Sequence, residues 1–198
     1  MMTTAAALDN SYRPIIVDEN LKPATPLAVG AGHVDPVKAR DPGLVYDAGI
    51  QDYIDLLCTL NYTQKQLRKF APGPVSCSEF AEGAADLNYP SFVVQFDAKT
   101  NVRTLTRTLT KVSELPETYE ARVVNPRSDK VEVIVEPRKL EFVGAGEKLT
   151  YKVQFRSKVV FDPSTSSDSK DEMEYGYIIW ENTEHQVKSP VVLMWKGS

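Results

Sequence analysis

The chain has 198 residues, of which 42% are hydrophobic and 25% charged, and its formal net charge is −4 at pH 7. This composition is typical of a folded globular protein and excludes a disordered tail. Because an acidic chain gains nothing from releasing the counterions of phosphates, nucleic acid is not expected as a partner. No apolar run approaches the roughly 20 residues of a membrane span, so no membrane partner is expected either.

Residues 1–45 show no sustained period and are rich in Pro, Gly and Asp. This pattern predicts connecting loops with at most a turn of helix. The apolar islands at 15–17 and 27–29 are too short to form a core of their own, so we expect most of this segment to depend on other parts of a protein. The first residues lack a basic stretch followed by an apolar core, so the chain as written has no signal peptide.

Two short helices are predicted next. Ile50, Tyr53, Ile54 and Leu57 are spaced i, i+3, i+4 and i+7, which is one face of a helix, and Asp47 precedes it as a candidate cap. A second helix is predicted to begin at Thr63, because Thr63 and Gln66 have the spacing of a capping box. The Pro- and Gly-rich residues 71–74 end it.

From residue 88 onward the period changes to two, as in half-buried strands. Strands are predicted at 92–96, 102–112, 118–124, 131–135, 149–155, 175–179 and 187–193. Pro190 should place part of the last strand at an edge or a bulge. The polar, serine-rich residues 162–174 should form an exposed loop. About seven short alternating strands predict a mainly β chain with an antiparallel β-sandwich.

The side chains that could carry catalysis or bind a metal are sparse. His33 and His185 are the two histidines, and no Gly-x-Ser-x-Gly element accompanies them, so no catalytic residue is predicted. Zinc would have to gather His33, Cys58, Cys77 and His185 from distant positions, so no metal is predicted. Gly30-x-Gly32 lacks the third glycine and the βαβ unit of a dinucleotide site, so no cofactor is predicted.

Two covalent features depend on the compartment of the protein. Cys58 and Cys77 would be free thiols in a cytosolic protein and a disulfide in a secreted one, and composition does not decide between them. Asn61-Tyr62-Thr63 is an N-glycosylation triplet, which is a weak signal alone because such triplets occur by chance.

Several stretches resemble the plant subtilisin-like serine proteases (subtilases), and they follow one another in the family's order. Two stretches resemble the end of the family's catalytic domain: GAGHVDP (30–36) and ARDPGLVYD (39–47). Residues 2–5 also resemble the end of the helix that carries the family's catalytic serine. The helix and loop that follow are resembled by DYIDLLC (52–58) with the triplet at Asn61. The fibronectin type III-like domain is resembled by DLNYPSF (86–92), RTLTKV (107–112) and YGYIIW (175–180).

The resemblance implies a division of the chain and a role. Residues 1–47 would be a remnant of the α/β subtilisin catalytic domain, 48–85 a helical linker, and 86–198 a fibronectin III-like sandwich. The family oxidises the pair Cys58 and Cys77. Independently of the resemblance, we expect Asn61 to carry an N-glycan, because the loop between the two helices should be exposed. The catalytic Asp, His and Ser, the oxyanion-hole Asn and the inserted protease-associated domain of the family all precede Met1, so no residue here inherits those roles.

The resemblance also implies partners and a location. The parent would be a secreted serine endopeptidase of the plant cell wall space, acting on proteins or peptides. This chain would be its non-catalytic C-terminal region, which supports the folding of the upstream catalytic domain and shapes substrate access. Two alternatives stay open, a free-standing extracellular binding module and a decoy that docks on intact subtilases.

Overall fold

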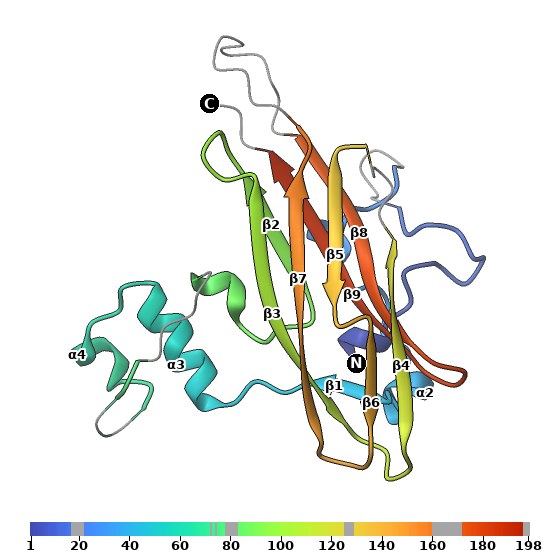
Figure 1. The fold of residues 1–198 in the computed structure, drawn as a ribbon, viewed down its shortest axis with the longest axis horizontal. Coiled ribbons are helices and arrows are strands. Elements are labelled where there is room, and N and C mark those ends of the chain that lie inside the picture. Colours follow the sequence, from blue (N-terminus) through green and yellow to red (C-terminus); the bar gives the residue numbers. More distant parts are fainter. Residues whose placement is uncertain are drawn as a thin grey trace.

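The computed structural model describes residues 1–16, 22–71, 73, 75–77, 83–124, 129–159 and 172–195. Its strands form two packed sheets, with the short helices outside them (Figure 1). The helices are η1 (Met2–Thr4), α1 (Pro26–Val29), α2 (Pro36–Arg40), α3 (Ile50–Thr59), α4 (Gln64–Leu67) and η2 (Gly83–Asp86). The strands are β1 (Leu44–Tyr46), β2 (Phe92–Phe96), β3 (Val102–Lys111), β4 (Glu117–Val124), β5 (Val131–Glu136), β6 (Lys139–Phe142), β7 (Lys148–Ser157), β8 (Glu172–Glu181) and β9 (Gln186–Trp195).

The two sheets have the orders β1-β3-β7-β5 and β2-β9-β8-β4-β6. The residues that alternate along the strands meet between the sheets, where they form one apolar core around Tyr151, Phe155 and Trp180. The Tyr151 and Trp180 rings meet edge to face, with their centroids 5.0 Å apart. The prediction of a mainly β, fibronectin III-like sandwich is therefore confirmed.

Two strand predictions need correction, and the prediction that Pro190 lies at a local edge is confirmed. β2 pairs with β9 in parallel, so the sandwich is not wholly antiparallel. β9 is an interior strand, but Pro190 lies where it has β8 as its one strand neighbour, because pairing with β2 begins at Val191. A proline is tolerated there because no ladder bond to a second strand is lost. Of the loop predicted at 162–174, residues 172–174 belong to β8, and the rest lies outside the described residues.

The helical segment is confirmed in outline and corrected at one cap. The backbone N–H of Thr63 donates to Gln66 Oε1 at 2.9 Å, as the predicted capping box requires. α3, however, begins after Gly49, whose N–H donates to Asp52 Oδ2 at 2.7 Å. Asp47 is therefore not the cap, and its carboxylate instead pairs with Lys148 Nζ at 2.8 Å. The hairpin of α3 and α4 stands to one side of the sandwich (Figure 1).

The described part of the N-terminal segment, residues 1–16 and 22–43, contributes no side chain to the central core, but it covers the outer face of β9. η1 and α1 both contact that strand. Thr3, Thr4 and Ala5 are buried, as are Ile179 and Val192 outside the central core. The Lys188 ammonium donates to the carbonyl of Ala5 at 2.7 Å. The second sheet is therefore buried on two faces at β9, one by the sandwich core and the other by the N-terminal segment.

Candidate functional site

The junction between the N-terminal segment and the sandwich begins at β1. This strand of three residues lies at the edge of the first sheet, where it pairs antiparallel with β3. Tyr46 extends from β1 between the sheets, and its Oη lies 2.6 Å from Tyr151 Oη and 2.8 Å from Ser189 Oγ. Burial raises the pKa of both tyrosines, so both stay neutral phenols that can donate and accept. One hydroxyl cluster thus joins β1, β7 and β9.

A second cluster surrounds His185 in the turn between β8 and β9. The imidazole side chain is 9% exposed, and its Nε2 lies 3.2 Å from Asp41 Oδ1, just before β1. Its Nδ1 lies 3.3 Å from Tyr119 Oη and 3.8 Å from Glu117 Oε2, both on β4. The Tyr119 hydroxyl donates to Glu117. Gly43 packs against this cluster with φ +70°, and a Cβ there would lie 2.4 Å from Tyr119 Oη.

Neighbouring groups determine the protonation states of Glu117 and Tyr119 in this cluster. Burial disfavours the charged form of Glu117, but hydrogen bonds from Ser113 and Tyr119 and the nearby ammonium of Lys111 outweigh it, so the pKa of Glu117 is lowered. Burial and the bond to Glu117 raise the pKa of Tyr119 far above its ordinary value. Glu117 is therefore a carboxylate at neutral pH, and Tyr119 keeps its proton.

The Asp41–His185 pair resembles two members of a catalytic triad, but its geometry does not activate a nucleophile. A general base must receive the proton of a hydroxyl that attacks the substrate. The hydroxyl next to His185 belongs to Tyr119, which donates to Glu117 instead. His33, the other histidine, is exposed, and its backbone pairs with Ala6. No catalytic role is assigned to either histidine.

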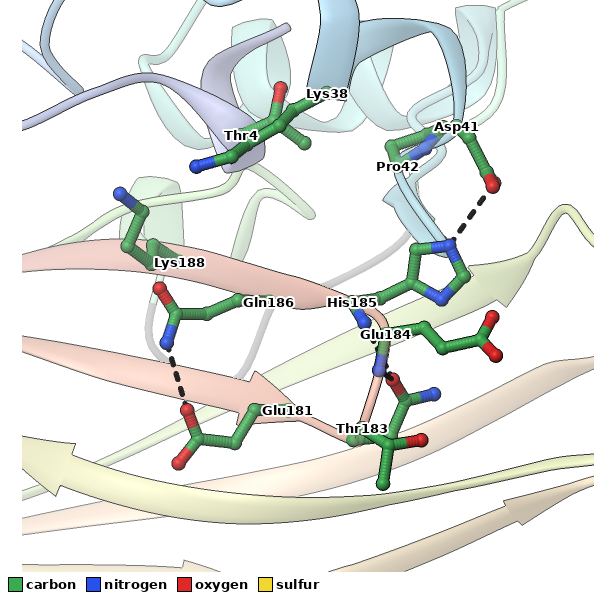
Figure 2. A pocket seen from close by; sticks show the side chains of 11 residues that line it. Thr4, Lys38, Asp41, Pro42, Glu181, Thr183, Glu184, His185, Gln186 and Lys188 are labelled. Carbon is green, nitrogen blue, oxygen red and sulfur yellow. Dashed lines mark hydrogen bonds and ion pairs between the residues drawn. The ribbon is translucent and has the colours of Figure 1, made fainter.

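A polar hollow of about 350 Å³ lies between the His185 turn and the N-terminal segment. Figure 2 shows Lys38, Thr4 and Lys188 on one side of it, and His185 directed toward Asp41 on the other. Gln186 closes part of its wall by donating to Glu181 at 2.9 Å. Acidic and basic side chains both line this hollow. Such a mixed lining suits a contact between two parts of the chain better than a binding site for a ligand of one charge.

The linker from η2 to β2 is held by two side chains whose role sequence reasoning did not predict. Arg107 is 3% exposed. Its guanidinium donates to the carbonyls of Ala85, Tyr89, Ser91 and Thr106 at 2.8–3.0 Å, and it stacks on Phe92. The Asn88 amide makes two 2.9 Å hydrogen bonds to the backbone of Thr108 and so replaces a strand at that edge of β3. Both residues lie in stretches that carried the resemblance.

Four apolar side chains remain exposed beside the junction, and we call them the N-terminal apolar surface. Met1, Met2, Tyr53 and Tyr89 are 72%, 44%, 48% and 41% exposed. They line a common hollow of about 280 Å³, and the Tyr89 hydroxyl donates to Met2 Sδ at 3.2 Å. They come from η1 with its preceding residue, α3 and the linker, which are distant in sequence. Clustered exposed apolar side chains of this kind mark contact surfaces.

The remaining candidate residues lie in the helical segment. Cys58 and Cys77 form a disulfide, with their Cα atoms 6.0 Å apart, which ties the end of α3 to the residues beyond α4. The two sulfurs are therefore not available as metal ligands, and no group of three metal-binding side chains occurs among the described residues. Asn61 is exposed between α3 and α4, with φ +61°.

Known proteins are similar both to the sandwich and to the segments that precede it. Residues 86–193 match a family described as "Fibronectin type-III domain". Subtilisin-like protease SBT3 of Solanum lycopersicum is 41% identical over 97% of this chain and 25% of its own length. SBT1.3 and SBT5.3 of Arabidopsis thaliana are 35% and 38% identical, each over 98% of this chain. The chain belongs to the fibronectin type-III domain family, and nearly its whole length is similar to part of plant subtilisin-like proteases.

The chain spans about a quarter of the length of the relatives that it matches. The match to the relatives includes the N-terminal segment and the helical hairpin as well as the fibronectin type-III domain. Within the described residues, none of the helices has the length and the apolar character that crossing a membrane requires.

Proposed function

We propose that this chain is the non-catalytic C-terminal region of a secreted serine endopeptidase that hydrolyses proteins or peptides. In this role it packs against the upstream catalytic domain, supports the folding of that domain and shapes the access of substrates. Three units are expected from the sequence: 1–47, 48–85 and 86–198. In this proposal they together hold the upstream catalytic domain, and 1–47 is the continuation of that domain.

The observation that carries this proposal is the N-terminal apolar surface next to a firmly held junction. β1, Tyr46 and Lys188 fasten the N-terminal segment to the sandwich, while Met1, Met2, Tyr53 and Tyr89 stay exposed beside it. A rigid support that exposes apolar side chains at one place is suited to receive another folded domain. The identity to relatives about four times longer supports a protease domain as that partner.

A chimera tests this proposal. This chain replaces the matching quarter of tomato SBT3, and the secreted protein is assayed for peptide hydrolysis. We expect an active, secreted chimera. Replacing Tyr53 and Tyr89 together with serine should lower the secreted activity at least about tenfold, because each aromatic ring contributes about 1.5–3 kcal/mol when it is buried against a partner.

The matched control is Leu115→Ser, because Leu115 is 75% exposed in the β3–β4 loop, outside the N-terminal apolar surface. This variant should keep the activity of the unmodified chimera. If the tyrosine variant were as active as the control, the surface would not hold the catalytic domain. If every chimera were inactive although the chain folds alone, a free-standing extracellular module would explain the chain better.

We also propose that Asn61 carries an N-glycan and that the parent protein is extracellular. The Asn61 side chain is exposed in a loop of a disulfide-bonded hairpin, which is accessible and suits an oxidising compartment. Chain secreted from plant cells should lose mass on treatment with a glycosidase, and the Asn61→Gln variant should not. Equal masses before and after treatment of the unmodified chain would refute the glycan.

A further inference from the structure

His185 is surrounded by groups that accept hydrogen bonds. Asp41 Oδ1 lies 3.2 Å from its Nε2, and a carboxylate can only accept. Tyr119 lies 3.3 Å from its Nδ1, and because the Tyr119 proton is donated to Glu117, the phenol oxygen can only accept there. A neutral imidazole has one N–H and would leave one of these contacts without a donor. The imidazolium has two N–H groups and satisfies both.

The charges around the ring favour the same form. Two carboxylates, Asp41 and Glu117, lie within 4 Å of the ring nitrogens, and Glu117 stays ionised for the reasons given above. Lys111 offsets part of this charge, since its fully buried ammonium lies 3.9 Å from Glu117 Oε1. The other charged side chains around the adjoining hollow are Lys38 on α2, Glu181 on β8, Glu184 in the turn and Lys188 on β9.

The His185 ring lies between the segment that enters β1 and the second sheet, so its charge affects how the two are held together. Asp41 precedes β1, whereas Glu117 lies on β4 of the second sheet and His185 lies in the turn that joins β8 and β9 of that sheet. Gly43 lies against the ring, and its carbonyl accepts from the N–H of Val112 at 3.1 Å beyond the end of β3. The contact through His185 therefore joins the segment that enters β1 to the body of the sandwich.

We propose that His185 is a pH-sensitive latch, whose imidazolium bridges Asp41 and Glu117 and holds the segment at 41–46 on the sandwich. Histidine ordinarily changes charge near about pH 6.5. The latch is closed when the ring carries two protons and loosens when the ring loses one of them. This inference goes beyond the proposed function, because the latch acts within this chain and requires no contact with a catalytic domain.

Amide hydrogen exchange, measured by NMR at pH 5.5 and pH 8 and corrected for the intrinsic pH effect, tests the latch. The amide to follow is that of Val112, which donates to Gly43. Its protection factor should be roughly 3- to 10-fold higher at pH 5.5 in the unmodified chain. His185→Gln, which keeps a polar side chain without the charge, should show the same protection at both pH values.

Two further variants make the result independent of how well His185→Gln folds. Asp41→Asn removes one carboxylate from an exposed position and should reduce the pH response. His33→Gln changes the other histidine, which is exposed in the same segment, and should leave the response unchanged. A Val112 protection factor that does not change with pH in the unmodified chain would overturn the proposal, as would a pH response that persists in His185→Gln or is undiminished in Asp41→Asn.

Discussion

Replacing Arg107 with alanine is expected to lower the free energy of unfolding by about 3–5 kcal/mol, because four carbonyls lose their buried charged donor. The guanidinium joins the linker at Ala85, Tyr89 and Ser91 to β3, and its face packs on the Phe92 ring. Alanine also leaves a cavity in this place. Urea unfolding followed by the fluorescence of the buried Trp180 and Trp195 measures the loss.

The matched control for this prediction is Arg122→Ala. Arg122 pairs with Glu181 at 2.6 Å, but about half of its side chain is exposed, so its loss should cost less than about 1 kcal/mol. Arg107→Lys keeps the charge but cannot reach four carbonyls from one planar group, and it should fall between the two. A loss for Arg107→Ala no larger than that of the control would show that the buried guanidinium does not hold the linker.

Replacing Gly43 with alanine is expected to lower the free energy of unfolding by about 2–4 kcal/mol. Part of the loss is backbone strain, because φ at Gly43 is +70°, where a residue with a Cβ is disfavoured. The rest is a steric clash, because the new methyl would lie 2.4 Å from Tyr119 Oη and 2.7 Å from His185 Cγ. Relief of the clash would separate β1 from the second sheet. Urea unfolding measures this loss as well.

Gly146→Ala is the control that separates the two contributions. Gly146 has φ +79° in the turn before β7, and a Cβ there meets no atom within 4 Å. Its substitution should therefore cost only the strain, about 1 kcal/mol. If both variants lost the same free energy, Gly43 would not be packed against the Tyr119 and His185 side chains.

The strands of the sandwich could be predicted from the sequence because their alternation is local. β7 shows this most clearly, since its alternate side chains Tyr151, Val153 and Phe155 are all buried. β6 and β1 have four and three residues, which are too few to show a period, and their positions depend on the partner strand. The parallel pairing of β2 with β9 also joins residues that are distant in sequence, so no local pattern predicts it.

The residues of the junction could not be predicted either, because they are distant in sequence and meet only in the fold. Asp41, Glu117 and His185 meet only because β1, β4 and the β8–β9 turn come together in the fold. The apolar face predicted for α3 shows a related limit: Ile54 is buried, but Ile50 is 78% exposed and Tyr53 is 48% exposed. A periodic apolar face predicts that a helix packs on something, but the pattern does not say whether the partner lies in the same chain.

The segment that enters the sandwich at β1 and the fibronectin type-III domain form one folded unit. Hydrogen exchange on the intact chain tests it most directly, because the amides of Leu44–Tyr46 can be compared with those of β3. We expect amides in the β1–β3 ladder to exchange as slowly as those shared by β3 and β7, and Gly43→Ala to accelerate the exchange of both. Fast exchange throughout the β1–β3 ladder of the unmodified chain would show that the sandwich folds without β1 and that the two parts are not one folded unit.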